Sequence, residues 1–110
     1  MTSLKVGQPD AIRGRIETPP VRMVLEGIVQ RLSLFGPGGN APPSGMYLVL
    51  NKTLTVGDRT FDKVYLGPSD FQIGGQYVLQ GDLRVVTKRG IPATIKYAVF
   101  ENATKMEVEP

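Results

Sequence analysis

The sequence predicts an all-β domain whose strands close into a small barrel, and two observations support this prediction. Alternating apolar and polar residues recur along the chain, whereas no segment of ten or more residues shows the 3.6-residue period of an amphipathic helix. Glycines interrupt two of the alternating segments, at Gly27 and Gly81, each within an L-x-G-x-[V/L] pattern. A glycine on the inner face of a strand favours a sharp bend or a close backbone approach, which a coiled barrel strand requires.

The chain begins with residues 1–21, which show no sustained period and end in Pro19-Pro20. We expect an irregular N-terminal arm here, flexible or in contact with a partner, and a barrel domain over residues 22–110. The basic residues of the arm suit contact with a polyanion or with a neighbouring subunit. A solvated terminus explains them equally well.

The first barrel strand is expected over residues 22–35. The glycine- and proline-rich segment over residues 36–45 follows it and predicts a long loop, of the kind that is commonly functional. Residues 46–51 predict a second strand that is apolar on both faces. Such a strand is either covered on both sides or offers the face that carries Tyr47 to a ligand or partner.

A hairpin is expected next, because residues 53–56 and 59–66 read as strands on either side of Gly57-Asp58. A two-residue connection that contains glycine is typical of a tight β-hairpin turn. Pro68 then ends the strand and favours one short helical turn before the chain continues.

The clearest strand is predicted over residues 76–86, after a turn at Gly74-Gly75. Its period of two separates an apolar side from a polar side, namely Tyr77, Leu79, Leu83 and Val85 from Gln76, Gln80, Asp82 and Arg84. Residues 95–101 predict the last central strand, and residues 105–108 predict a short tail strand.

Five principal strands, a glycine-bent first strand, and a short link between the third and fourth strands resemble the oligonucleotide/oligosaccharide-binding (OB) fold, a five-stranded Greek-key barrel. The resemblance covers residues 22–108 and lies in residues 25–29, 46–50, 67–71, 75–81 and 97–100. The long loop and the Gly57-Asp58 hairpin fit a two-sheet sandwich equally well.

Proteins of this fold commonly bind their ligands across the second and third strands, between the loops that follow strands one and four. The resemblance therefore implies a site for single-stranded DNA or RNA made of Tyr47, Val49, Asn51, Lys63, Tyr65, Arg84, Lys88 and Arg89. Aromatic rings stack on bases, and lysine and arginine neutralise phosphates. In the alternative interpretation, Tyr47 and Tyr65 are core or interface residues, and Lys88-Arg89 belongs to an ordinary solvated turn.

The composition argues against catalysis and against metal or cofactor binding. The chain has neither histidine nor cysteine, which removes the commonest general base, the usual zinc ligands and the Ser-His and Cys-His nucleophilic pairs. Asp58, Asp62 and Asp70 lie close in sequence, but their spacing does not match a calcium-binding EF-hand. We expect no enzyme activity, no cofactor and no metal.

Charge and hydropathy limit the partners. The net charge of +3 permits an anionic partner. No apolar run approaches the roughly 20 residues of a membrane span. The N-terminal residues lack the pattern of an export signal, so a cytoplasmic location is expected. The sequence thus predicts a binding module for single-stranded nucleic acid. The alternative is a structural or adaptor protein that self-associates or binds a protein through strand edges and the N-terminal arm, which the two apolar faces of residues 46–51 favour.

Overall fold

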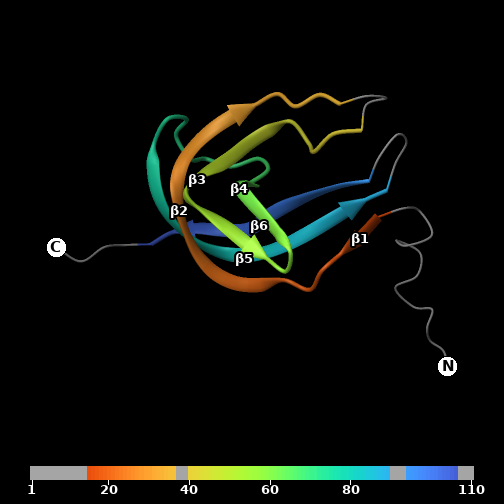
Figure 1. Cartoon of the computed structure of the whole chain (residues 1–110). Coiled ribbons are helices and arrows are strands. Elements are labelled where there is room, and N and C mark those ends of the chain that lie inside the picture. Colours follow the sequence, from red (N-terminus) through yellow and green to blue (C-terminus); the bar gives the residue numbers. More distant parts are fainter. Residues whose placement is uncertain (1–14, 37–39, 90–93, 107–110) are drawn as a thin grey trace.

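The chain folds into a closed, five-stranded mixed β-barrel with one additional short strand (Figure 1). The computed structural model describes residues 15–36, 40–89 and 94–106, with side chains from Thr18 onward. The strands are β1 (Arg15–Glu17), β2 (Val21–Leu32), β3 (Gly45–Val56), β4 (Arg59–Tyr65), β5 (Gln76–Lys88) and β6 (Ile95–Lys105). No helix that could cross a membrane is present in this described part of the chain.

The strand order around the barrel is β5-β2-β3-β4-β6, and pairing of β6 with β5 closes it. All neighbours are antiparallel except β4 and β6, which are parallel. This arrangement is compatible with OB-like folds and excludes the two-sheet sandwich, because all the strands belong to one sheet. β1 pairs with the end of β5, beside the stretch that pairs with β2.

The two glycines on which the barrel prediction depends both lie at close backbone approaches. A Cβ atom on Gly27 would lie 2.1 Å from the carbonyl oxygen of Val49, where β2 begins to pair with β3. A Cβ atom on Gly81 would lie 2.9 Å from the carbonyl oxygen of Glu101 and 3.1 Å from the ring of Phe100, at a register shift between β5 and β6. Glycine is required at both positions because neither site has room for a side chain.

The core fills the barrel from all five principal strands. Its buried members are Val29, Met46, Leu48, Val64, Leu79, Leu83, Ala98 and Phe100. The predicted apolar side of β5 is confirmed, because Leu79, Leu83 and Val85 are buried. The turn at Gly57-Asp58 is also confirmed, and Gly57 adopts a φ of 62°, which glycine tolerates readily.

Several predicted limits differ from the structure. The first strand ends at Leu32 rather than at residue 35, and the two segments predicted at 46–51 and 53–56 form one continuous strand, β3. β6 continues to Lys105, so the separate tail strand is wrong as far as the chain is described, and residues 107–110 lie outside the described part. The link over residues 66–75 contains no helical turn at Pro68.

The predicted N-terminal arm is only partly described. Residues 1–14 lie outside the described residues, whereas Arg15–Glu17 forms β1 and pairs with Val86, Thr87 and Lys88. Backbone pairing with β5 therefore gives the end of this segment a regular structure that its sequence pattern does not predict.

Candidate nucleic-acid interface

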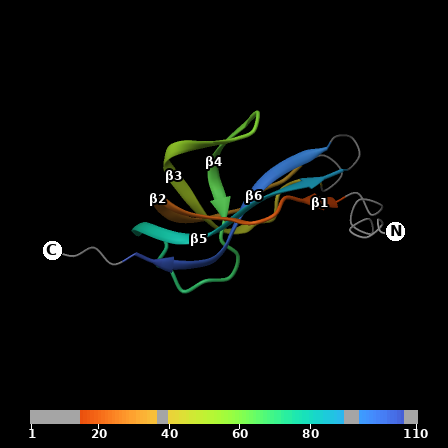
Figure 2. The ribbon, with the colours of Figure 1, turned by 90° about the horizontal axis from the view of Figure 1, so that it is seen from below.

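The hairpin formed by β3 and β4 diverges from the barrel on both of its sides. β3 leaves β2 after the pair of Gly27 with Leu50, and within the described residues β4 pairs with β6 at Tyr65 and Val99 only. Figure 2 shows this hairpin rising away from the other strands. One opening therefore lies between β4 and β6, and a second lies between β2 and β3.

The opening between β4 and β6 is a hollow of about 180 Å³, which we call the β4–β6 groove. It is lined by Pro42, Tyr47, Arg59, Thr60, Phe61, Asp62, Lys63, Lys96, Tyr97 and Ala98. Three of these residues are cationic and three are aromatic. The hollow is smaller than the ~300 to 1,000 Å³ of pockets that enclose a whole small molecule, so the groove suits part of an extended ligand.

The charge in the groove is positive. Arg59 and Lys63 come from β4 and Lys96 from β6, whereas Asp62 is the acidic residue among the lining side chains. The ammonium of Lys63 lies 3.3 Å from the carboxylate of Asp62, whose side chain is 73% exposed. Because exposed ion pairs contribute little free energy, a phosphate can take the place of this carboxylate at low cost.

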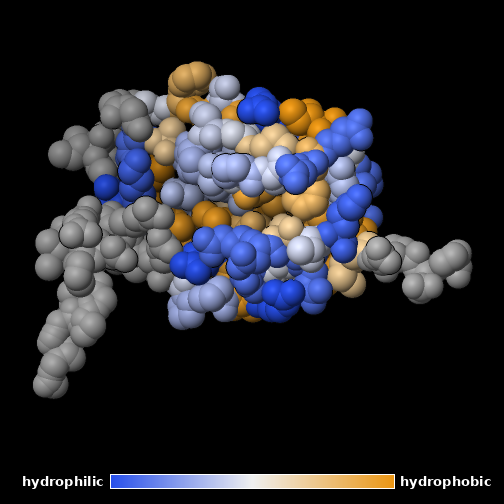
Figure 3. All heavy atoms as spheres, turned by 180° about the vertical axis from the view of Figure 1, so that it is seen from behind, coloured by the Kyte–Doolittle hydropathy of each residue, from blue (hydrophilic) through white to orange (hydrophobic). Residues whose placement is uncertain are grey.

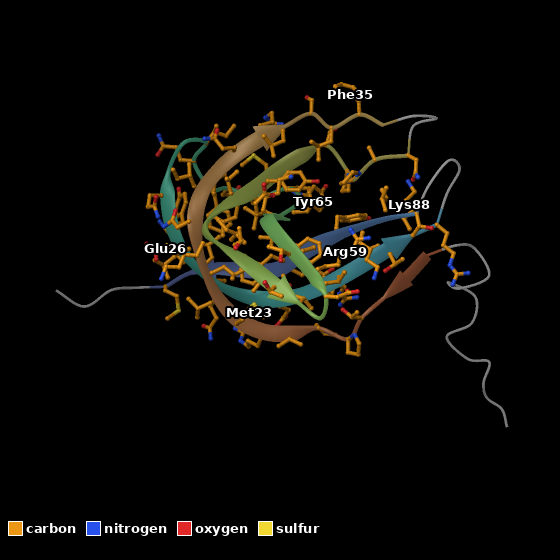
Figure 4. All side chains as sticks on the ribbon, in the orientation of Figure 1. Met23, Glu26, Phe35, Arg59, Tyr65 and Lys88 are labelled. Carbon is orange, nitrogen blue, oxygen red and sulfur yellow. The ribbon has the colours of Figure 1, made fainter. Side chains whose placement is uncertain are left out.

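The register brings several of the predicted site residues into one row on the outside of the barrel. Arg84 on β5 pairs with Val99 on β6, Val99 with Tyr65 on β4, and Tyr65 with Tyr47 on β3. Val49 and Lys63 form the next pair of β3 with β4. Figure 4 shows Tyr65 and Arg59 at the two ends of β4. These predicted residues are therefore neighbours in the sheet, but they do not form one exposed surface, because Tyr47 is buried.

Tyr47 is packed by its own chain. Only 1% of its surface is exposed, its ring centroid lies 5.2 Å from that of Tyr65, and its hydroxyl donates a hydrogen bond to the carbonyl oxygen of Pro43. Burial, and secondarily the neighbouring Tyr65 and Tyr97, raises the pKa of Tyr47 to about 12.

This packing has two consequences for the sequence interpretation. In this conformation the ring of Tyr47 is covered, so a base can stack on it only if the loop that contains Pro43 moves. Met46, Tyr47 and Leu48 are all buried within one chain, so the first half of residues 46–51 is covered on both faces, whereas Asn51 is exposed.

The remaining predicted residues lie outside the groove. Arg84 is 26% exposed and forms a 2.9 Å ion pair with Glu101. Lys88 and Arg89 are exposed at the end of β5, where Figure 4 shows Lys88. Asn51 is exposed on β3 and lines the second opening, between β2 and β3.

Five residues with suitable chemistry were missed from the sequence. The missed residues that line the groove are Arg59, Phe61, Lys96 and Tyr97, and Phe35 is 90% exposed after the end of β2. The alternation of the last strand places Lys96 on the same side as the buried Ala98, and no local signal shows that β4 and β6 separate there. The early end of β2 explains the exposure of Phe35, which the predicted strand had included.

Asp58, Asp62 and Asp70 do not form a cation site in the structure. Among the described residues, no three histidine, cysteine or acidic side chains come together as ligands for a metal ion.

Comparison with known proteins does not assign the chain to a family. No protein-family model, no curated protein and no solved structure matches it.

Proposed function

We propose that this chain is a non-catalytic module that binds single-stranded DNA or RNA in the β4–β6 groove. The observation that supports the proposal is the convergence of Arg59, Lys63 and Lys96 on a groove that also contains Phe61 and Tyr97. Proteins that bind single strands combine a positively charged groove with aromatic platforms, as this surface does.

The proposal includes membership of the OB superfamily. The order of the five barrel strands, the antiparallel pairs and the parallel pair of β4 with β6 support it. In that fold, ligands lie on the second and third strands between two flanking loops. Here Pro42, from the loop between β2 and β3, lines the groove, and Lys88 and Arg89 lie at the start of the connection between β5 and β6.

A continuous path for the strand extends from the groove toward the cations at the end of β5. Lys96 pairs with Thr87, and Ile95 pairs with Lys88, so the groove and the exposed basic residues are neighbours on the β5–β6 hairpin. Phe35 offers a further exposed ring for stacking. Arg84 is a weaker candidate, because a phosphate would have to displace Glu101 from it.

The test is fluorescence anisotropy of a labelled single-stranded oligonucleotide at several salt concentrations. Three phosphate contacts predict a slope of log K against log salt of about −2, so a fourfold increase in salt weakens binding about twentyfold. If Lys88 and Arg89 also contact phosphates, five contacts predict a slope of about −3.5. Reversal of both charges, with Lys88→Glu and Arg89→Glu, then abolishes most of the binding.

Neutral substitutions in the groove test whether it is the binding site. Lys63→Gln and Lys96→Gln each reduce the magnitude of the slope by about 0.7, because each removes one phosphate contact. Lys52→Gln is the matched control, since Lys52 is exposed and lines the opening between β2 and β3 instead. Absence of binding at low ionic strength, or an equal effect of Lys52→Gln, contradicts the proposal.

The alternative function, a structural or adaptor module, also has an observation in its favour. Among the residues that the structure describes, no strand pairs with part of one edge of β2, on the side that faces the opening between β2 and β3. This feature carries an inference that does not depend on nucleic-acid binding.

A further inference from the structure

The unpaired edge lies along the first half of β2. Residues 21–28 pair with β5 on one side, whereas pairing with β3 on the other side covers residues 27–32. Within the described residues, the backbone of residues 21–26 therefore has a neighbouring strand on one side only. Between this stretch and β3 lies a hollow of about 380 Å³, lined in part by Val24, Glu26 and Lys52.

The hydrogen-bond pattern shows which backbone groups face this opening. The amide of Val29 donates to the carbonyl oxygen of Gly75, so odd-numbered residues of β2 bond toward β5. On β3, the carbonyl oxygen of Met46 accepts a hydrogen bond from the amide of Leu66, just after β4, so the even-numbered residues of β3 bond toward β4. The odd-numbered residues of β3 therefore bond toward β2, where they pair with even-numbered residues. The amides and carbonyls of Arg22, Val24 and Glu26 consequently point into the opening.

The side chains of these three residues are also accessible. Arg22, Val24 and Glu26 are exposed, and 47% of the surface of Val24 is accessible. Figure 4 shows Glu26 along the outer curve of β2. Val21 is a second large exposed hydrophobic residue of β2, whereas Phe35, Ile73 and Met106 lie outside the strands. On the rear face of the molecule, hydrophobic and hydrophilic residues are interspersed (Figure 3). An apolar residue between two opposite charges on a free strand edge is a suitable surface for adding another strand.

We propose that this edge pairs with the same edge of a second copy of the chain, antiparallel and about a twofold axis at Val24. In this register Val24 lies opposite Val24 of the second copy, and Arg22 lies opposite Glu26 of the second copy, twice by symmetry. The pattern Arg22-x-Val24-x-Glu26 is thus complementary to itself in both hydrogen bonding and charge.

Charge also selects this register over its neighbours. A shift of the axis by one or two residues preserves the hydrogen-bond phase, because even-numbered residues still lie opposite each other. A shift by one residue places Val24 opposite Arg22 or Glu26 and loses both charge pairs, and a shift by two residues places Arg22 opposite Arg22 or Glu26 opposite Glu26. Within one chain, Arg22 already lies 3.2 Å from Asp82 on β5. The dimer extends this arrangement into a row in which Arg22 lies between Asp82 and Glu26 of the second copy.

The dimer interface and the β4–β6 groove lie at different openings of the barrel. The groove is bounded by β4 and β6, whereas the edge belongs to β2 and faces β3. Dimerisation therefore leaves the groove accessible, and its test has an outcome independent of nucleic-acid binding.

The first test is light scattering coupled to size-exclusion chromatography at micromolar protein concentration. The wild type is expected to form a dimer. Arg22→Glu and Glu26→Arg each place like charges opposite each other twice and raise the dimer Kd about tenfold or more. An equimolar mixture of the two variants regains the dimer, because each then supplies the charge that the other requires. Thermal unfolding followed by circular dichroism verifies that both variants fold, and Glu26→Arg leaves the Arg22–Asp82 pair intact.

The second test uses the absence of cysteine from the chain. Val24→Cys places two thiols opposite each other at the twofold axis, where the Cα separation of about 5.5 Å suits a disulfide. Mild oxidation is expected to give a covalent dimer with this variant and not with Thr53→Cys, across the opening on β3. A monomeric wild type, unaltered association of the charge variants, failure of their mixture to recover, or equal cross-linking of Thr53→Cys overturns the proposal.

Discussion

Replacement of Gly27 by alanine tests the closure of the barrel most directly. The added Cβ atom would lie 2.1 Å from the carbonyl oxygen of Val49 and 2.8 Å from its carbonyl carbon. Both obstacles are backbone atoms, so β2 and β3 have to separate by about 1 Å to relieve the contact in a close-packed interior. We expect Gly27→Ala to cost about 3 kcal/mol, at the upper end of the usual range for overpacking.

Gly57→Ala provides the matched control. No atom lies within 4 Å of the place that a Cβ atom on Gly57 would occupy, but the φ of 62° at this residue disfavours alanine, and this backbone conformation costs about 1 kcal/mol. The difference of about 2 kcal/mol corresponds to a melting temperature that is about 8 to 16 °C lower for Gly27→Ala than for Gly57→Ala. The measurement is thermal and denaturant unfolding followed by circular dichroism. Equal stability of the two variants, or a more stable Gly27→Ala, refutes the close approach of β2 to β3.

Three further predictions concern stability. Asn102→Ala removes the hydrogen bond that is the largest cause of the lowered pKa of Asp82, so part of its destabilisation is present above pH 3.8 and is lost as pH falls through the folded pKa. A cost of about 1 kcal/mol remains at every pH, because alanine is disfavoured at the φ of 56° of this residue. Acid titrations of unfolding measure the difference from the wild type, and a difference that does not change with pH contradicts the assignment. Tyr47→Phe loses the bond to Pro43 and costs about 1 kcal/mol at neutral pH. Because the pKa of Tyr47 is raised, its protonated hydroxyl stabilises the folded protein below pH 10, and this contribution is lost as pH rises through about 12. The absorbance titration of Tyr47→Phe is therefore expected to lack a phenolate step near pH 12, and an unaltered titration curve refutes the assignment. Phe100→Ala empties a fully buried position and costs about 3 to 5 kcal/mol in urea unfolding, whereas a loss below 1 kcal/mol argues against its place in the core.

The architecture of the barrel could be predicted from local sequence features. Alternation in residues 76–86 identifies the buried side of β5, and Gly57 and Gly74 mark turns because both adopt positive φ values. Gly27 and Gly81 indicate close approaches without showing which strand approaches. These features can be predicted from the sequence because they depend on side-chain direction and backbone conformation within a few residues.

The candidate site was less predictable because it depends on contacts between distant segments. Tyr47 lies in a segment that is apolar on both faces, so the sequence leaves open whether its ring is covered or faces a ligand; in the structure the ring packs against Tyr65 and its hydroxyl bonds to the carbonyl of Pro43. Lys96 lines the groove because β4 and β6 pair at a single described position. β1 is regular through pairing with β5, although its own three residues carry no periodic pattern.

The single parallel pair of β4 with β6 determines where the barrel opens first on heating. β6 pairs with β5 at nine positions and with β4 at one. Thermal opening is therefore expected to separate β4 from β6 while β5 and β6 remain paired. The amide of Tyr65 faces β6, because the amide of Leu66 donates to Met46 on β3. Its hydrogen is therefore expected to exchange with solvent ahead of those of Arg84 and Val86, which face β6 from β5. A nucleic-acid strand bound in the groove would lie across the contact between β4 and β6, so its binding is expected to slow the exchange of the Tyr65 amide hydrogen.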